Sequence, residues 1–442
     1  MNQAFLAIVV VAFAVGAYTG SMDDVSLGAL QGAEKAVTLA LKLVGYMAFF
    51  LGLMKVAEDG GLLKLLARAI RPLMVRLFPE VPPDHPAMSA MILNIAANML
   101  GLVNAATPLG IKAMIELNRL NRTPGVATNA MVLFLAINTS GLALLPSGVV
   151  SLRSAEDSAD PWGIIGSTLF ATAVATVVGI VVAKSLQRLS IFAAPEPEAA
   201  PDSEQGEEDT EAEQLIAMEQ TTETSYGVWI LRATLVAFLV VLIIPPLGAA
   251  IVPDGEQATR LREFAKTAGD WVLPSLIISL LLFGAFKGVK VYESFITGAK
   301  EGFTTGVMII PYLVAILSAV GMFRGSGAMQ ILTSKLGLLT DPIGIPGEVL
   351  PMALVRPLSG SGAYGLMTEL VQTHGPDSYI GYVATTLQGS TDTTFYVLAV
   401  YFGAVGVTKA RHAVVTGLSA DFAGFIATAI VCSIMFGHLI GG

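Results

Sequence analysis

The stretch MLGLVNAATPLGIKAM, residues 99–114, interrupts a long apolar segment with groups that lipid cannot accommodate. Asn104, Thr107 and Lys112 need hydrogen-bond partners, and hydrocarbon supplies none. Pro108 has no backbone N–H to donate, and proline is favoured at the first position of a helix. The stretch therefore predicts a helix that starts inside the membrane, with Thr107 as its N-cap, and lines a polar site.

The composition is that of a membrane protein. Of 442 residues, 54% are hydrophobic and 13% are charged, and the mean hydropathy is +0.70, whereas a soluble domain has about 25% charged residues. Runs long enough to cross about 30 Å of hydrocarbon as a helix recur near 4–20, 36–56, 88–117, 127–150, 161–186, 228–252, 271–286, 304–323, 380–404 and 412–440, with a shorter one near 347–371. We therefore expect an all-α polytopic membrane protein.

The net charge of −9 originates in one segment. Between Ala194 and Thr224 the chain has eleven acidic residues and no Lys or Arg. This composition is typical of a solvated, disordered linker, and an acidic docking site for a partner is the alternative. We divide the chain into a membrane repeat at 1–190, the linker at 191–227, a connecting transmembrane helix and loop at 228–267, and a second membrane repeat at 268–442.

The two membrane parts resemble each other in sequence. The stretch from Gly32, GAEKAVTLALKLVGYMAFFLGLMKVAEDGG, aligns without a gap with the stretch from Gly298, GAKEGFTTGVMIIPYLVAILSAVGMFRGSG. Further on, IKAMIEL aligns with YGLMTEL, and NTSG with GSTD, in the same order. Each half is therefore expected to be one structural unit.

Charge placement predicts opposite orientations for the two units. Loops rich in Lys and Arg favour the cytoplasm, and we assign to it the segments 62–78, 119–122, 184–188, 287–300 and 409–412. The segments 21–35, 151–160 and 372–379 then lie outside. This holds only if 88–117 and 350–371 each enter and leave on one side, as re-entrant or broken-helix hairpins. We expect two inverted repeats of about five helical segments each, with the N-terminus and the linker cytoplasmic.

Polar groups in the first half gather around the predicted helix start. Asn94 and Asn98 are four residues apart and share a helix face, and Asn104 and Thr107 follow. The start of a helix presents free N–H groups to carboxylate, phosphate or carbonyl oxygens. The alternative is that these amides only join neighbouring helices. The stretch INTSG adds three candidate binding residues, Asn138, Thr139 and Ser140.

The matching hairpin of the second half contains RPLSGSGAYG, residues 356–365. Ser359 and Ser361 can cap a helix, and they join the candidate binding residues. Arg356 at membrane depth is costly unless paired or hydrated. It either holds an anionic group of a substrate or acts as a counter-ion for Glu369 or Asp392, and the sequence does not decide between these roles.

A dense polar cluster follows in TLQGSTDTTFYVLAVYF, residues 386–402, where Gly389 is expected to interrupt a helix. A carboxylate surrounded by hydroxyls suits Na+ or H+, and a plain N-cap is the alternative. Asp392 is the first candidate for ion coupling, and Asp421 is the second. The remaining members are the binding candidates Gln388 and Ser390 and the ion-coupling candidates Thr391, Thr393 and Thr394.

No H-E-x-x-H, P-loop or G-x-S-x-G motif occurs, and the four histidines are scattered. We therefore expect no enzyme, no metal site and no cofactor beyond a coupling ion.

Longer stretches resemble known families. NIAANMLGLVNAATPLGIKAM and FLAINTSGLALLP are similar to the spore maturation protein A family, whereas RPLSGSGA, GPDSYIGYVATTLQGSTDTTFYVLAVYFG and RHAVVTGLSADFAG are similar to the spore maturation protein B family. The chain thus resembles a natural fusion of the two, covering about 1–190 and 268–442. The resemblance implies a multi-pass protein of the bacterial inner membrane with nucleoside recognition or "gate" domains, tied in spore formers to dehydration of the spore core.

These features favour a secondary transporter or permease-like protein for a small polar or anionic solute, nucleoside-like solutes included. Access would alternate around the broken-helix tips as one repeat unit swings against the other. The alternative is a non-transporting membrane assembly or gating protein of the spore maturation type. Expected partners are the lipid bilayer and a small solute, with no nucleic acid, and a homo-oligomer is left open.

Overall fold

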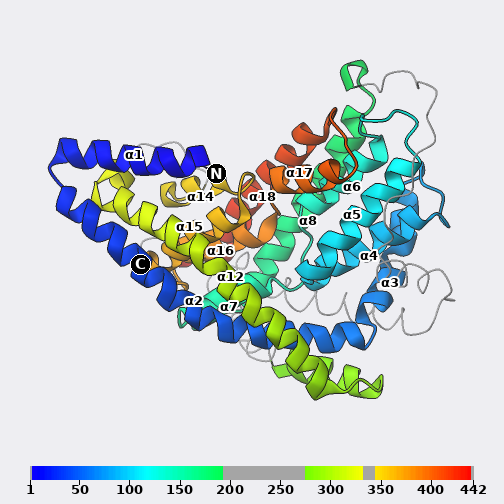
Figure 1. Ribbon diagram of the computed structural model, residues 1–442, viewed down its shortest axis with the longest axis horizontal. Coiled ribbons are helices and arrows are strands. Elements are labelled where there is room, and N and C mark those ends of the chain that lie inside the picture. The colour runs from blue at the N-terminus through cyan, green and yellow to red at the C-terminus, as the bar shows by residue number, and fades with distance from the viewer. Residues whose placement is uncertain (1, 193–273, 332–343, 440–442) are drawn as a thin grey trace.

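The computed structural model describes residues 2–192, 274–331 and 344–439, and these residues form helices and connecting loops (Figure 1). Within them, four helices are long and apolar enough to cross a bilayer, judged by length and composition. Shorter apolar helices accompany them. The prediction of an all-α polytopic membrane protein is confirmed. Most of the acidic linker and the expected helix at 228–252 lie outside the described residues.

Both halves contain their elements in the same order. The first half has α1 (Asn2–Thr19), α2 (Met22–Asp59), α3 (Leu62–Leu77), α4 (Pro86–Leu100), α5 (Val103–Arg119), α6 (Asn129–Thr139), α7 (Ser147–Ala155), α8 (Ile164–Leu186) and η1 (Ser190–Phe192). The second half has a helix at Pro274–Phe286, then α12 (Val291–Gly325), η3 (Gly347–Val349), α14 (Leu350–Val355), α15 (Gly360–His374), α16 (Tyr379–Ser390), α17 (Thr394–Ala404), α18 (Ala413–Phe436) and η4 (Gly437–Leu439). A long helix, a hairpin, an interrupted helix and a closing helix recur in each.

The two longest helices, α2 and α12, pack antiparallel along their length (Figure 1). Gly28 faces Gly321, and Gly302 faces Ala48 near the other end, so backbone lies directly against backbone. Small residues permit this close approach, which drives helix association in membranes. α2 begins at Met22, so the acidic segment 21–35, expected as an outside loop, is an extension of the helix.

The closing helices α8 and α18 also pack antiparallel through small residues. Gly179 lies beside Ala420, and Gly424 lies beside Ala175. Both pairs join helices that occupy equivalent positions in the two halves. Antiparallel packing of equivalent helices supports the predicted inversion of the second repeat.

The first hairpin is present, but its break is not where the sequence placed it. α4 ends at Gly101, which has a φ of 72°. The N–H of Gly101 donates to the Asn98 carbonyl, and that of Leu102 donates to the Ala97 carbonyl, which is the Schellman arrangement. α5 then starts at Val103 and runs through Pro108. The prediction that Thr107 caps a helix starting at Pro108 is therefore wrong.

Loops predicted to share a side of the membrane lie in contact. On one face, the N–H of Ala127 donates to the Lys409 carbonyl at 3.0 Å. On the other, fully buried Arg153 forms an ion pair with Asp377 at 2.9 Å. These contacts group the loops into two sets, one around Ala127 and Lys409 and the other around Arg153 and Asp377. Each set agrees with the charge-based assignment. Which set faces the cytoplasm stays a prediction.

Each half contributes one short helix to the apolar core of the other half. One buried cluster combines the hairpin α4–α5 and α6 with Val397, Tyr401 and Phe402 of α17. A second combines α15 and α16 with Val149, Val150 and other residues of α7. Each interrupted helix therefore starts in one apolar core and ends in the other, as α17 beside α6 shows in Figure 1.

We predict that the α2–α12 contact tolerates no added methyl group. In Gly32→Ala, the new Cβ would overlap the Leu317 backbone, which overpacks the interface and costs about 1–3 kcal/mol. Gly45→Ala is the matched control, because nothing lies near that position and alanine favours the helix by about 0.5–1 kcal/mol. The midpoint temperature of thermal unfolding in detergent should fall for Gly32→Ala and stay level or rise for Gly45→Ala. Equal midpoints would contradict the packing.

The two loop sets predict opposite labelling. Cys432 is fully buried, so single cysteines can be read in a Cys432→Ser background. Glu80→Cys and His374→Cys both replace exposed residues in different loop sets. A membrane-impermeant maleimide applied to sealed vesicles should label one and spare the other. Labelling of both from the same side would contradict the inverted arrangement.

Candidate functional site

The candidate site is built where the two interrupted helices meet. α6 ends at Thr139 and α16 ends at Ser390, so each leaves carbonyl groups without the partners of a continuous helix. The N–H of Asp392 donates to the Thr139 carbonyl at 2.6 Å and joins the two interruptions. Gly141 stands at this contact with a φ of 54°. The second interruption was expected at Gly389, but α16 passes through it.

Each hairpin turn contacts the interruption of its own half. The N–H of Leu144 donates to the Met99 carbonyl at 2.9 Å, and that of Phe395 donates to the Pro357 carbonyl at 3.0 Å. The hairpin turns therefore reach the broken helices, and the broken helices reach each other. This convergence places the polar segments that the sequence singled out in one region.

Arg356 follows α14 and caps the end of α16. Its guanidinium donates to the carbonyl of Thr391, to the carbonyl of Gln388 at 3.1 Å and to the hydroxyl of Thr393 at 3.0 Å. The side chain is buried. A cation at the C-terminal end of a helix complements the helix dipole and satisfies carbonyls that lipid cannot. Arg356 therefore holds the backbone of the interruption in place.

The sequence analysis did not include these hydrogen bonds, and the charge of Arg356 is also close to that of Asp392, one of its expected counter-ions. Glu369 forms its ion pair with Arg324, so it is not the partner of Arg356. Asp392 accepts a hydrogen bond from the N–H of Thr393 at 2.7 Å. The sequence could not indicate the role of Arg356, because the carbonyl acceptors lie more than thirty residues away.

A network of amides joins the first hairpin to both broken helices. Asn94 donates to the Ala106 carbonyl at 2.7 Å and to the Tyr401 hydroxyl at 3.2 Å. Asn98 donates to the Asn138 side-chain oxygen at 2.9 Å, and the Tyr401 hydroxyl reaches the same oxygen at 3.3 Å. Three predicted residues are thus brought together, and they link helices as the alternative interpretation requires.

The sequence analysis missed Tyr401. It belongs to α17, which crosses from the second half into the core of the first. Its ring stacks on Phe134 at 5.9 Å between centroids, and its hydroxyl enters the amide network. The only signal in the sequence is a hydroxyl-bearing aromatic in an apolar run, which is common at helix interfaces.

A second polar group surrounds α18. The hydroxyl of Thr394 donates to the Asp421 carboxylate at 2.6 Å. Ser140 lies nearby in the same layer of broken helices, where its carbonyl accepts from Thr172 at 2.7 Å and its hydroxyl from Thr176 at 2.8 Å. Hydroxyls therefore satisfy the end of α6 and one oxygen of the buried acid.

Some polar atoms in this region have no hydrogen-bond partner within the described part of the chain. They include the side-chain oxygens Oδ1 of Asn94, Oε1 of Gln388 and Oδ1 of Asp421, and the Nε of Arg356. Buried polar atoms normally have partners, so each of these oxygens is available to a donor from a solute, an ion or water.

The remaining candidate residues either form local hydrogen bonds within their own helix ends or lie outside the networks described above. Ser359 is the N-cap of α15 and accepts from the Gly362 N–H at 3.0 Å, with the Ser361 hydroxyl 3.4 Å away. Ser390 donates to the Leu387 carbonyl. Thr107 is half-buried in the second turn of α5, and Asn104 lies in its first turn. Across the described ranges, no three His, Cys, Asp or Glu side chains gather in a way that could hold a metal ion.

Comparison with known proteins gives the same two halves. Spore maturation protein B of Bacillus subtilis (strain 168) is 49% identical over 166 residues, which is 38% of this chain and 93% of that protein. Spore maturation protein A of the same organism is 40% identical over 182 residues, which is 41% of this chain and 93% of that protein. The chain belongs to the spore maturation protein family. The two matches cover different halves, in agreement with a fusion.

A family model described as nucleoside recognition, or gate, also matches, over residues 40–156 and 307–408. These regions contain both hairpins, both broken helices and every site residue predicted from the sequence except Asp421. No solved structure matches this member of the spore maturation family.

We predict that removing the Arg356 cap destabilises the broken helix. Arg356→Gln leaves the carbonyls of Gln388 and Thr391 without a charged donor, and such a hydrogen bond contributes about 1.5–3 kcal/mol. Arg122→Gln is the control, because Arg122 is exposed. The midpoint of thermal unfolding should fall for Arg356→Gln alone. A stable Arg356→Gln protein would show that the cap is dispensable.

Proposed function

We propose that this protein is a secondary transporter whose solute site lies at the junction of the two broken helices. The observation that carries the proposal is the 2.6 Å hydrogen bond between the Asp392 N–H and the Thr139 carbonyl. It joins irregular backbone from both halves in the interior of a membrane protein. Irregular backbone at such depth is characteristic of transporter sites built from discontinuous helices.

The chemistry at the junction favours an uncharged polar solute. The Asn94 and Gln388 side chains carry unpaired oxygens that accept hydrogen bonds. The guanidinium of Arg356 is engaged with the carbonyls of Gln388 and Thr391, which weakens the case for an anionic solute. A heterocycle with several N–H and O–H donors, such as a nucleoside, fits these acceptors. The nucleoside recognition family model supports the same class.

The ion coupled to transport would bind near Asp421 and Asp392. Asp421 is buried, with one oxygen bonded to Thr394 and the other unpaired. Intramembrane carboxylates of this kind mark proton or cation pathways. We propose Na+ or H+ as the coupling ion, no other cofactor, and no enzymatic activity. We place the protein in the bacterial inner membrane, with the N-terminus and the linker cytoplasmic.

A non-transporting gating or assembly role is the second candidate. Both relatives are named spore maturation proteins, and the amides of the first hairpin hydrogen-bond mainly to neighbouring helices. In this role, the polar junction would fix helix positions within a membrane assembly or a homo-oligomer. Measured solute uptake separates the two candidates.

We predict that proteoliposomes containing the full chain take up a radiolabelled nucleoside from a panel, driven by a sodium or proton gradient. Tyr401→Phe removes one hydroxyl from the amide network and should lower uptake several-fold. Tyr312→Phe is the control, because Tyr312 is 55% exposed on α12. Asp421→Asn should abolish the dependence on the gradient.

Absence of uptake across the panel would reject transport of this class and favour the gating role. Uptake that is unchanged in Tyr401→Phe would reject the junction as the site. Gradient dependence that survives in Asp421→Asn, and is lost in Asp392→Asn, would move the coupling role to Asp392.

A further inference from the structure

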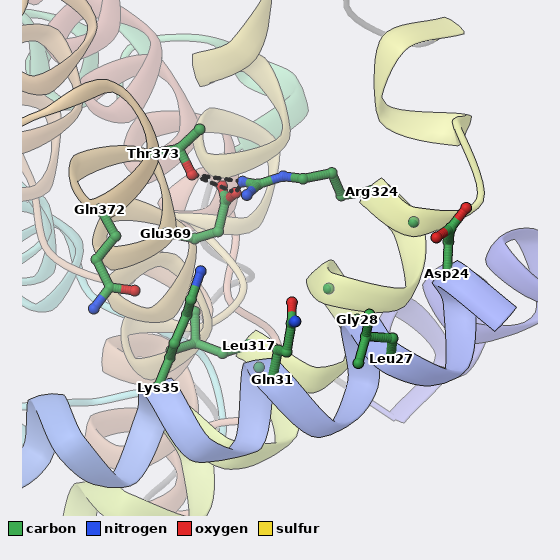
Figure 2. Close-up of a pocket in the computed structure, with 13 residues that line it drawn as sticks. Asp24, Leu27, Gly28, Gln31, Lys35, Leu317, Arg324, Glu369, Gln372 and Thr373 are labelled. Atoms are coloured by element: carbon green, nitrogen blue, oxygen red, sulfur yellow. Dashed lines mark hydrogen bonds and ion pairs between the residues drawn. The ribbon is translucent and has the colours of Figure 1, made fainter.

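A cavity of about 370 Å³ lies away from the junction, between α2, α12 and the end of α15 (Figure 2). Its walls include the backbone of Gly28, Gly32 and Gly321, where the two long helices cross. The end of α15 is the exit of the second hairpin. The volume lies in the range of small-molecule sites.

The cavity contains two cationic side chains. Lys35 points into it from α2 toward α15 (Figure 2), and no ion pair or hydrogen bond involves its ammonium group within the described ranges. Arg324 enters from α12 and contacts Glu369 and the Thr373 hydroxyl on α15. The amides of Gln31 and Gln372 line the same space. Glu369 also lines the cavity and pairs with Arg324, and the Gln372 amide donates to Glu156 at 3.0 Å, so the positive charge without a counter-ion is that of Lys35.

The repeat provides an internal comparison. In the alignment of the two long helices, Lys35 corresponds to Glu301, Arg324 to Glu58 and Gly321 to Lys55. At that other crossing the charges are therefore reversed, and a lysine stands where the cavity has a glycine. Its ammonium forms ion pairs with Glu58 at 3.3 Å and with Asp59 at 3.2 Å.

This comparison shows that packing of the two long helices does not depend on the charged residues at the crossing. The crossing of the long helices forms at both positions, so it does not require Lys35 or Arg324. At one position, acidic residues receive their counter-ion from Lys55 of the same chain. At the other, the position equivalent to Lys55 is Gly321, and space remains beside the cations.

We propose that this cavity binds a phosphate-type oxyanion between Lys35 and Arg324. Both side chains are suited to phosphate, Arg through its forked donors and Lys as a point charge. Asp24 lies at the opposite end of the cavity (Figure 2), eleven residues from Lys35 and thus about 16 Å along the helix. It would accept from hydroxyl or ammonium groups on the same ligand. The ligand is either a phospholipid headgroup or a soluble phosphate compound.

The test measures thermal unfolding of the full chain in detergent during titration with inorganic phosphate or with phosphatidylglycerol. Diacylglycerol, which has acyl chains and no phosphate, is the ligand control. Stabilisation by phosphatidylglycerol alone identifies a lipid site, and stabilisation by inorganic phosphate identifies a soluble ligand. A binding site stabilises the folded state in proportion to its occupancy.

Lys35→Gln should raise the half-saturating concentration by about five-fold or more, because it removes one charged contact. Gln31→Glu adds a negative charge to the same wall and should weaken binding without removing either cation. Lys300→Gln, an exposed lysine on α12 outside the cavity, should bind as the original chain does. Neither substitution in the cavity breaks a contact of the fold, because both side chains are exposed.

The proposal is overturned if neither phosphate nor phosphatidylglycerol stabilises the protein. It is also overturned if Lys35→Gln and Lys300→Gln respond alike. Because the measurement follows binding and not uptake, failure of the transport proposal leaves this result interpretable.

Discussion

The structure depends on one constraint, namely that a helix interrupted inside a membrane must have its exposed backbone groups satisfied by protein. The carbonyls at the end of α16 accept from Arg356, and the carbonyl at the end of α6 accepts from Asp392. Hydrocarbon offers no substitute for either donor. The end of α16 is satisfied within its own half, whereas the end of α6 depends on Asp392 of the other half, and this contact is where the two interruptions meet.

The same constraint explains why the halves are interleaved. Each interrupted helix crosses from one apolar core into the other, so α17 completes the core of the first half and α7 that of the second. Glycine contacts between α2 and α12 hold the equivalent long helices at close distance. A single polypeptide keeps both halves in equal amounts, whereas the two relatives in Bacillus subtilis are separate proteins.

The sequence predicted the hairpins and the loop sets, because apolar length and basic residues are local properties. It misplaced the first break because Thr107 and Pro108 resemble a helix start, whereas Gly101 ends α4 in a left-handed conformation. Glycine after an apolar helical run is a stop signal, and here it ends α4, whereas α5 accommodates the proline within its second turn. The roles of Arg356 and Tyr401 depend on partners from distant segments, so no local pattern could reveal them.

Interleaving also limits the movements by which the proposed transporter could alternate access to the junction. If residues 1–190 swung as one body against 268–442, α17 would leave the core formed with α5 and α6, and α7 would leave the core formed with α16. Both movements would expose buried apolar surface and break the contact between Thr139 and Asp392. The hairpins are also tied to the junction, because Asn98 bonds to Asn138 in the first half and Arg356 bonds to the end of α16 in the second. Each hairpin also contributes buried residues to one of the two cores. Opening of the junction therefore has to break polar contacts within it, and the hydrogen bonds of a bound solute would have to replace them.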